Sequence, residues 1–137
     1  MTDQLARLAQ PFPPRYISKK GKFDYVSHSE ITQRLLEIVG PYNLEVKRII
    51  EVDGKVDGII IALTCTIDGR EVTVEEAGGI GTRAMSDSGE LLKEAISDGL
   101  KRAARHFGLG LHLWAQDNYY LHHRFESEAE QEEESNE

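Results

Sequence analysis

The sequence predicts an α+β domain in which helices pack against a three-stranded antiparallel β-meander. Three runs rich in β-branched residues are separated by the dipeptides Asp53-Gly54 and Asp68-Gly69, and Asp-Gly readily adopts the positive φ angles of tight hairpin turns. Segments with apolar residues at helical spacing precede and follow these runs. The 137 residues suffice for one domain with one hydrophobic core.

The N-terminal part is expected to be an arm followed by a hairpin. Residues 1–14 are expected to form a flexible arm, because Pro11, Pro13 and Pro14 oppose a continuing helix. The next stretch, "RYISKKGKFDYV", is expected to form two short extended pieces that turn at Gly21. This hairpin carries three basic residues, Lys19, Lys20 and Lys22.

The stretch "SHSEITQRLLEIVGP" predicts the first helix. Ser27 and Glu30 have the spacing of a capping box, in which each side chain satisfies a free backbone N–H. Gly40 and Pro41 end the helix. Its apolar face consists of Ile31, Leu35, Ile38 and Val39.

The three runs that form the meander follow this helix. The middle run, residues 59–63, is apolar at every position. Because successive strand residues point to opposite faces of a sheet, either chain elements pack on both faces or a neighbouring subunit covers one of them.

The stretch "GGIGTRAMSDSG" is expected to be a flexible loop, and a long helix follows it. The loop lacks the glycine-lysine pattern that holds nucleotide phosphates, which argues against a nucleotide-driven motor. Asp87 and Glu90 can cap the helix, and Gly108 is placed to end it in a left-handed conformation. The predicted apolar face consists of Leu92, Ile96, Leu100, Ala103 and Phe107.

The negative charge belongs mainly to the C-terminus. The formal net charge is −8, and the last twelve residues hold seven of the 24 acidic residues. The remaining 17 acidic and 16 basic residues nearly cancel. Residues 126–137 are therefore expected to be a disordered acidic tail, which either keeps the protein soluble or competes with DNA or recruits a partner.

Three bases are concentrated near the end of the long helix. Lys101, Arg102 and Arg105, which we call the basic arc, span roughly 100° of the helix surface, away from its apolar face. They are suited to pairing with consecutive phosphates of one strand. The alternative is a solvated face with an ordinary Asp98–Arg102 pair, where the bases complement the helix dipole.

Aromatic residues near the hairpin lysines strengthen the nucleic-acid interpretation. Tyr16, Phe23 and Tyr25 can stack on bases, although core packing is the simpler role for Phe23 and Tyr25. A basic patch with adjacent aromatic residues is typical of a nucleic-acid-binding surface.

No pattern in the sequence predicts an enzyme, a metal centre or a cofactor. Cys65 lies in an apolar strand without an activating helix end, and one thiol fits a reducing cytosolic compartment. No apolar run is long enough to span a bilayer. Three histidines lack cysteine or carboxylate neighbours at metal-site spacing and are expected at the surface: His112, His122 and His123.

The order of these pieces resembles the Rad fifty-two type single-strand annealing proteins, which include related phage annealases. "KEAISDGLKRAARHFG" resembles the family's signature helix. The resemblance extends over residues 15–125, the expected annealing domain. It includes the hairpin entry "PPRYISKK", the first helix "YVSHSEITQRLLEIVGPYN", the third strand "DGREVTVEEAGGIGTRAMS" and the segment "QDNYYLHHRF".

The resemblance implies ATP-independent binding of single-stranded DNA and annealing of complementary strands in homologous recombination and DNA repair. Such proteins assemble into rings or open helical oligomers, and basic residues of the signature helix line the DNA groove. Lys101, Arg102 and Arg105 are those residues here, so that repetition of the arc would give one salt-sensitive phosphate track. The bases nearest two other family DNA positions are further candidates, Arg34 and Arg83.

The resemblance also bears on the setting of the protein. The long partner-binding tail of eukaryotic members is expected to be absent, and the expected protein is a compact phage or prophage annealase in the cytoplasm of a bacterial host. A single-strand binding protein or an exonuclease is the expected partner. Three rival interpretations are a DNA-end protection or architectural protein without annealing activity, a protein-interaction module whose arc is only a solvated face, and, least favoured, a metal-dependent nuclease.

Overall fold

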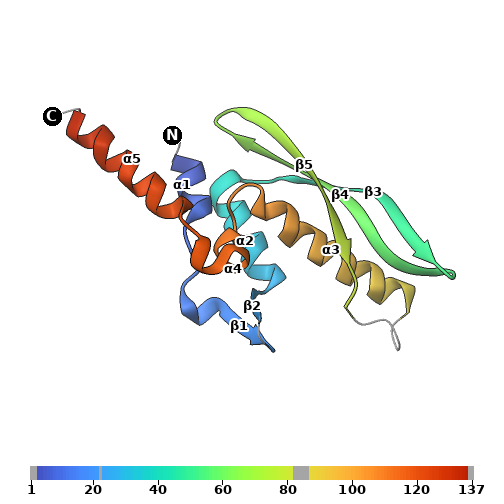
Figure 1. Ribbon diagram of the computed structural model, residues 1–137. Coiled ribbons are helices and arrows are strands. Elements are labelled where there is room, and N and C mark those ends of the chain that lie inside the picture. The colour runs from blue at the N-terminus through green and yellow to red at the C-terminus, as the bar shows by residue number, and fades with distance from the viewer. Residues whose placement is uncertain (1–2, 22, 82–86, 136–137) are drawn as a thin grey trace.

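In the computed structural model, a three-stranded antiparallel sheet lies along one long helix, and the shorter elements gather at one end of that pair (Figure 1). The structure describes residues 3–21, 23–81 and 87–135. The predicted α+β class, N-terminal hairpin, meander and long helix are confirmed. In chain order the elements are α1 (Asp3–Ala9), η1 (Pro14–Tyr16), β1 (Ile17–Lys20), β2 (Phe23–Val26), α2 (His28–Val39), β3 (Asn43–Val52), β4 (Lys55–Ile67), β5 (Arg70–Gly79), α3 (Ser88–Arg105), α4 (Leu111–Ala115), η2 (Gln116–Asn118) and α5 (Leu121–Ser135).

Both predicted Asp-Gly turns of the meander are confirmed. The φ angles are 51° and 76° at Asp53 and Gly54, and 56° and 75° at Asp68 and Gly69. Positive φ at both central residues matches the right-handed twist of the flanking strands. The register accordingly pairs the strand residues that flank each turn, Val52 with Lys55 and Ile67 with Arg70.

The core lies between α3 and the sheet. Every second residue of the β4 segment from Ile59 to Cys65 is buried against the helix side. Ile60, which points to the other face, is only half-buried. The buried residues of α3 are Leu91, Ala95, Gly99, Leu100, Ala103 and Ala104.

The buried face of α3 therefore differs from the predicted one in its first half. Leu92 and Ile96 are only partly buried. The helix instead turns its row of small residues toward β5, because these residues allow a close approach. A Cβ added at Gly78 would lie 2.0 Å from the carbonyl oxygen of Ala95. Gly78 is thus a buried strand residue at the crossing of β5 and α3, and the flexible loop expected there was wrong at this position.

The N-terminal segment is also structured where a flexible arm was expected. Residues Asp3–Ala9 form α1, and Leu8, Ala9 and Phe12 are buried in the core. The Gln4 side chain donates to the carbonyls of Ile38 and Thr66 and accepts from the N–H of Asp68. The apolar burial and these bonds fix the segment despite its prolines.

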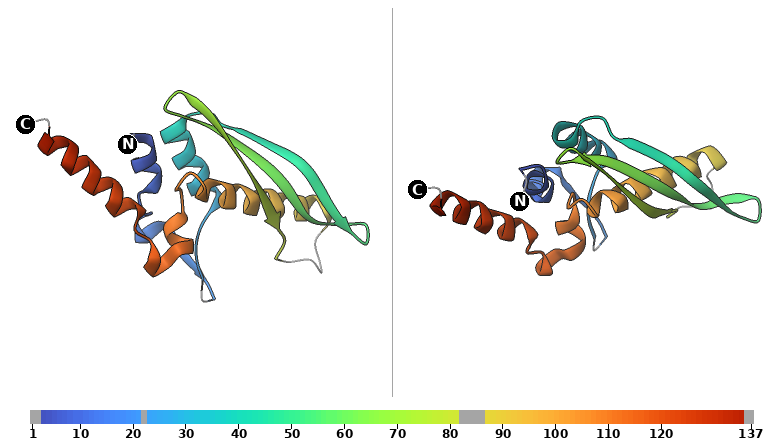
Figure 2. Two further views of the ribbon diagram at one scale, coloured as in Figure 1. Left: turned by 45° about the horizontal axis from the view of Figure 1, so that its top comes forward. Right: turned by 90° about the horizontal axis from the view of Figure 1, so that it is seen from above.

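The acidic C-terminus differs from its expected disorder as well. Residues Leu121–Ser135 form α5, which projects from the body on the side opposite the β3–β4 turn (Figures 1 and 2). Glutamate is a good helix former, and the His122–Glu126 pair at 3.0 Å joins the first turns. Among the described residues, no helix combines the length and the apolar character needed to cross a bilayer.

Candidate nucleic-acid interface

The basic arc lies at the C-terminal end of α3, on the side that the core does not use. The helix begins as predicted, with the Asp87 carboxylate accepting the N–H of Glu90 at 2.9 Å. Lys101 and Arg105 are half-buried and Arg102 is exposed, whereas Ala103 and Ala104 of the same turn are buried. The arc is therefore a surface feature held on a rigid, packed helix.

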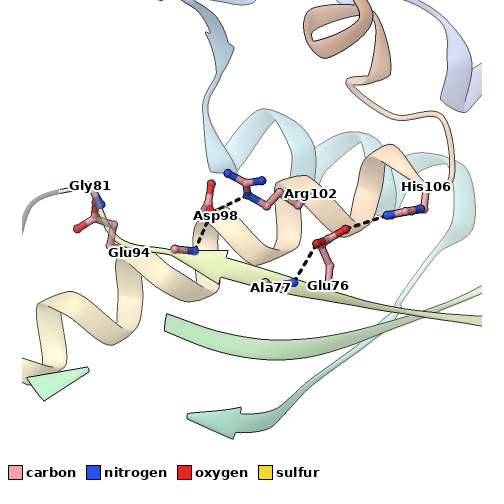
Figure 3. A network of polar contacts seen from close by, with 8 residues as sticks. Glu76, Ala77, Gly81, Glu94, Asp98, Arg102 and His106 are labelled. Carbon is pink, nitrogen blue, oxygen red and sulfur yellow. Dashed lines mark hydrogen bonds and ion pairs between the residues drawn. The ribbon is translucent and has the colours of Figure 1, made fainter. Parts of the chain in front are cut away.

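One carboxylate connects the arc to the end of β5. Asp98 Oδ2 accepts from Arg102 Nε at 2.9 Å and from the backbone N–H of Gly79 at 2.8 Å (Figure 3). One turn earlier, Glu94 Oε1 accepts from the N–H of Gly81 at 2.7 Å. The glycines are thus backbone contact points. The Asp98–Arg102 pair expected for a solvated face is present, and it holds the stem of Arg102 through Nε only.

A second link ties the end of α3 to the middle of β5. His106 Nε2 and Glu76 Oε2 lie 2.9 Å apart, and Glu76 Oε1 accepts the N–H of Ala77 at 3.0 Å (Figure 3). The hydrogen bond from His106 is the main reason why the pKa of Glu76 lies below its usual value, followed by the bond from Ala77. Glu76 is therefore ionised at neutral pH and helps to fix the arc against the sheet.

Arg105 differs from Arg102 in its surroundings. Burial, and then the positive charge of Arg102, lower the pKa of Arg105, but an arginine remains charged at neutral pH. In the described ranges of the chain, no acidic side chain forms an ion pair with Arg105. Asp98 and Glu76 are close enough to act on the charge of Arg105, but an arriving anion would still meet a guanidinium that no direct ion pair within the described residues occupies.

Three hollows open along the arc and share its residues. The first, of about 440 Å³, is lined by Lys101 and Arg105 together with residues of β2 and α4. The second, of about 500 Å³, contains Lys101 and Arg102, and the third, of about 310 Å³, contains Arg102 and Arg105. Each of the three basic side chains therefore lines two of the three hollows, and the positive charge is spread over several neighbouring depressions.

The structure brings the predicted hairpin to the arc. Asp24, Tyr25 and Val26 of β2 line the first hollow, and Lys101 Nζ lies 5.6 Å from the centroid of the Tyr25 ring. Tyr25 is 41% exposed, so its expected role in the core was wrong. Its ring faces the hollow because β2 runs beside the end of α3.

The predicted hairpin lysines occupy different situations. The Lys19 side chain is strongly exposed, and its Nζ lies 3.8 Å from Oδ1 of Asp24, the residue with which Lys19 pairs across the hairpin. Lys20 is the last residue of β1, paired with Phe23. Lys22 and Arg83 lie outside the described residues. None of the hollows described above includes Lys19 among its lining residues.

Arg34, the remaining predicted site residue, lies in another part of the structure. Its guanidinium donates to the carbonyl of Gln10 and covers the ring of Phe12, 3.8 Å from the ring centroid. His112 and Tyr119 complete this group: the Phe12 N–H donates to His112 Nε2 at 3.0 Å, and Tyr119 donates to the Ala9 carbonyl. We call Phe12, Arg34, His112 and Tyr119 the N-terminal clamp, because together they hold residues 9–12 against α2 and α4.

The remaining candidates for chemistry have structural surroundings. His112 is half-buried in the clamp rather than at the surface, and burial lowers its pKa, with a further contribution from Arg34. Burial raises the pKa of the Cys65 thiol to about 11, which leaves it protonated and unreactive. Among the residues that the structure describes, no group of three or more histidine, cysteine or acidic side chains could hold a metal ion.

Sequence reasoning missed one residue of this surface. Trp114, in α4, is 69% exposed and lines both the first and the third hollow. The available signal was a single tryptophan placed six residues after the predicted helix end at Gly108. Its position beside the arc depends on the turn through Gly108 and Gly110, whose φ angles are 93° and 76°.

Comparison with known protein families finds a match over nearly the whole chain. A model of the family described as "Rad52/22 family double-strand break repair protein" matches residues 1–134. No match is found among curated proteins. The matched range contains the hairpin, the basic arc, the N-terminal clamp and α4.

Proposed function

The chain belongs to the Rad52/22 family of double-strand break repair proteins, and we propose that it binds single-stranded DNA and anneals complementary strands without ATP. Proteins of this family are DNA-binding repair proteins that act without catalysing a reaction. The match over nearly the whole chain is the observation that carries the proposal. The geometry of the arc supports a specific location for the strand.

In the proposed complex, the phosphates follow the basic arc. Lys101, Arg102 and Arg105 each line two of the three hollows, and in the proposed complex each pairs with a different phosphate of one extended strand. Asp98 occupies Nε of Arg102, and the Nη groups of that guanidinium remain at the exposed end of the side chain. Binding of this kind releases counterions and weakens steeply with salt.

Annealing requires that bases remain accessible while the backbone is held. Contacts to phosphates carry no sequence information, so a strand held through them keeps its pairing edges open to a complementary strand. The proposed role of the protein is thus geometric and electrostatic: it reduces repulsion between two polyanions and keeps one of them extended. No bond in the DNA is made or broken.

We further propose that protomers assemble, so that arcs of neighbouring protomers join into one track. Support comes from β3, an edge strand of the sheet that carries exposed apolar residues. An exposed apolar edge strand is a ready surface for pairing with another chain. The residues concerned are Val46, Ile49 and Val52.

The proposal is tested by annealing two complementary labelled oligonucleotides, without ATP or metal ions, across a salt series. Faster annealing than in the absence of protein, declining as salt increases, is the expected result. Tight strand binding without faster annealing would contradict annealing and favour a DNA-end protection protein. Absence of strand binding at low salt would contradict the whole assignment and leave the arc as a solvated face.

A further inference from the structure

Trp114 is much more exposed than is usual for a tryptophan side chain in a folded protein. It is the single tryptophan of the chain, and 69% of its surface is accessible. Tryptophan is highly buried on average in folded proteins, and its large apolar face gains free energy when it leaves water. Its neighbours Leu111 and Leu113 are half-buried, so α4 is packed while the indole remains outside.

The indole of Trp114 lies beside the basic arc and outside the core. Trp114 lines the first hollow together with Tyr25, Lys101 and Arg105. It also lines the third hollow with Arg102 and Arg105. The side chain therefore stands where the two hollows meet, next to the arginine that has no ion-pair partner in the described part of the chain. Figure 1 shows α4 between the end of α3 and the β1–β2 hairpin.

The first hollow combines two kinds of groups that a single strand needs. Lys101 and Arg105 supply positive charge for phosphates, and Tyr25 and Trp114 supply exposed aromatic faces on β2 and α4. Proteins that bind single strands without sequence preference use this combination, because every base has a π-face on which an aromatic side chain can stack. Val26, Ile31 and Leu113 add apolar surface to the lining of this hollow, as expected for a site that takes a base together with a phosphate.

We propose that Trp114 stacks on a base of the bound strand, with Lys101 and Arg105 pairing with the adjoining phosphates and Tyr25 lining the same hollow. This inference rests on the proposed function and deepens it by naming a base-contacting residue. Stacking engages the face of a base and leaves its hydrogen-bonding edge open, so it is compatible with pairing to a complementary strand. Each protomer would hold one stacked base beside its phosphate contacts.

The single tryptophan makes the proposal directly measurable. The full chain is titrated with oligo-deoxythymidine while Trp114 emission and the anisotropy of a labelled strand are recorded in parallel. We expect emission to be quenched with the same midpoint as the anisotropy change, and to recover at high salt. Anisotropy that reports binding without a change in emission would overturn the stacking proposal and leave strand binding intact. No binding in either channel would overturn both.

Substitutions separate stacking from a structural role. Trp114→Ala is expected to weaken strand binding about tenfold, with an unchanged thermal midpoint because the indole is exposed. Trp114→Phe should restore most of the affinity, since it keeps an aromatic face. Tyr120→Ala is the matched control, because Tyr120 is 68% exposed and lies outside the hollows of the arc.

The same experiments also show whether a neighbouring protomer, and not DNA, covers the indole of Trp114. If a neighbouring protomer covers the indole, emission will be blue-shifted before DNA is added and Trp114→Ala will change the oligomeric state. Such a result, or a Trp114→Ala variant that binds the strand as tightly as the unmodified chain, would overturn the proposal.

Discussion

Arg34 and Arg105 are both partly buried arginines with aromatic side chains nearby, but they differ in the contacts that their guanidinium groups make. Both side chains are half-buried, and burial lowers the pKa of each without removing its charge. Arg34, in the N-terminal clamp, donates to the Gln10 carbonyl and covers the ring of Phe12. Arg105, in the basic arc, faces two hollows that also include Trp114.

The two arginines differ in whether other residues of the chain already contact the guanidinium. The chain itself supplies the acceptor and the aromatic ring to Arg34, so this arginine stabilises the fold. At Arg105 the aromatic residues are exposed and no acid among the described residues pairs with it, so a ligand can supply the acceptor. Two arginines beside aromatic rings can therefore have opposite roles, and only the three-dimensional contacts separate them.

The largest expected effect comes from removing charge in the arc. Lys101→Ala combined with Arg102→Ala should weaken strand binding about 100-fold or more at low salt, because two charged hydrogen-bonding groups are lost. Anisotropy of a labelled oligonucleotide measures the affinity, and circular dichroism checks the fold. The control removes the same charge from the meander outside β3, with Lys55→Ala and Arg70→Ala. Normal affinity in the folded arc variant would reject the site.

The clamp should respond to substitution in the opposite way. Arg34→Ala is expected to lower the free energy of unfolding by about 2 kcal/mol, because the Gln10 carbonyl loses its donor and the Phe12 ring loses its cation. Urea denaturation measures this change, and strand affinity of the folded variant should stay the same. A variant of normal stability that binds DNA poorly would place Arg34 in the interface after all.

The clamp should also make stability depend on pH. Burial and the charge of Arg34 lower the pKa of His112 in the folded state, whereas the unfolded value is about 6.5. The unfolded chain therefore binds more protons below about pH 6.5, and stability should fall as the pH decreases through that range. Glu76, whose pKa is also lowered, acts only in a more acidic range, below the ordinary value of a glutamate.

A conservative variant isolates the contribution of His112. His112→Gln keeps an acceptor for the N–H of Phe12 but cannot be protonated. Urea denaturation at about pH 7.5 and about pH 5.5 should show a smaller loss of stability in this variant than in the unmodified chain. Equal losses in both would mean that His112 is not the responsible group.

The smallest expected effect comes from a substitution of Asp98, the acidic residue that pairs with Arg102 of the basic arc. Asp98→Asn keeps an oxygen for the N–H of Gly79 and removes the charge that competes with phosphate for Arg102. Strand binding should tighten about threefold at low salt, and the difference should fade as salt screens the exposed pair. Weaker binding by the folded variant would show that Asp98 orients the guanidinium instead of competing for it.

The features that could be predicted from the sequence depend on neighbouring residues. The Asp87 cap, the Asp-Gly turns and the left-handed Gly108 follow from short-range backbone preferences, and the structure has all of them. The N-cap bond from the Glu30 N–H to Ser27 is also present. The basic arc belongs to the same class, because the positions of its residues follow from helical spacing alone.

The features that could not be predicted depend on packing between distant segments. Gly78 is a strand residue because α3 approaches its Cα, and that approach involves residues nearly twenty positions away. Arg34 is part of the clamp because residues 9–12 pack against α2. The exposure of Tyr25 and Trp114 likewise depends on how β2 and α4 meet at the end of α3. The C-terminus was predicted to be disordered because of its high negative charge, although its glutamates are good helix formers.

The salt dependence of strand affinity tests the central claim most directly. For single strands, each phosphate contact contributes about 0.7 to the slope of log affinity against log salt concentration. Arg105→Ala should therefore lower the slope by at least about 0.7 relative to the unmodified chain, while Arg34→Ala should leave it unchanged. An unchanged slope for Arg105→Ala, or an equal reduction for Arg34→Ala, would contradict a phosphate track along the basic arc.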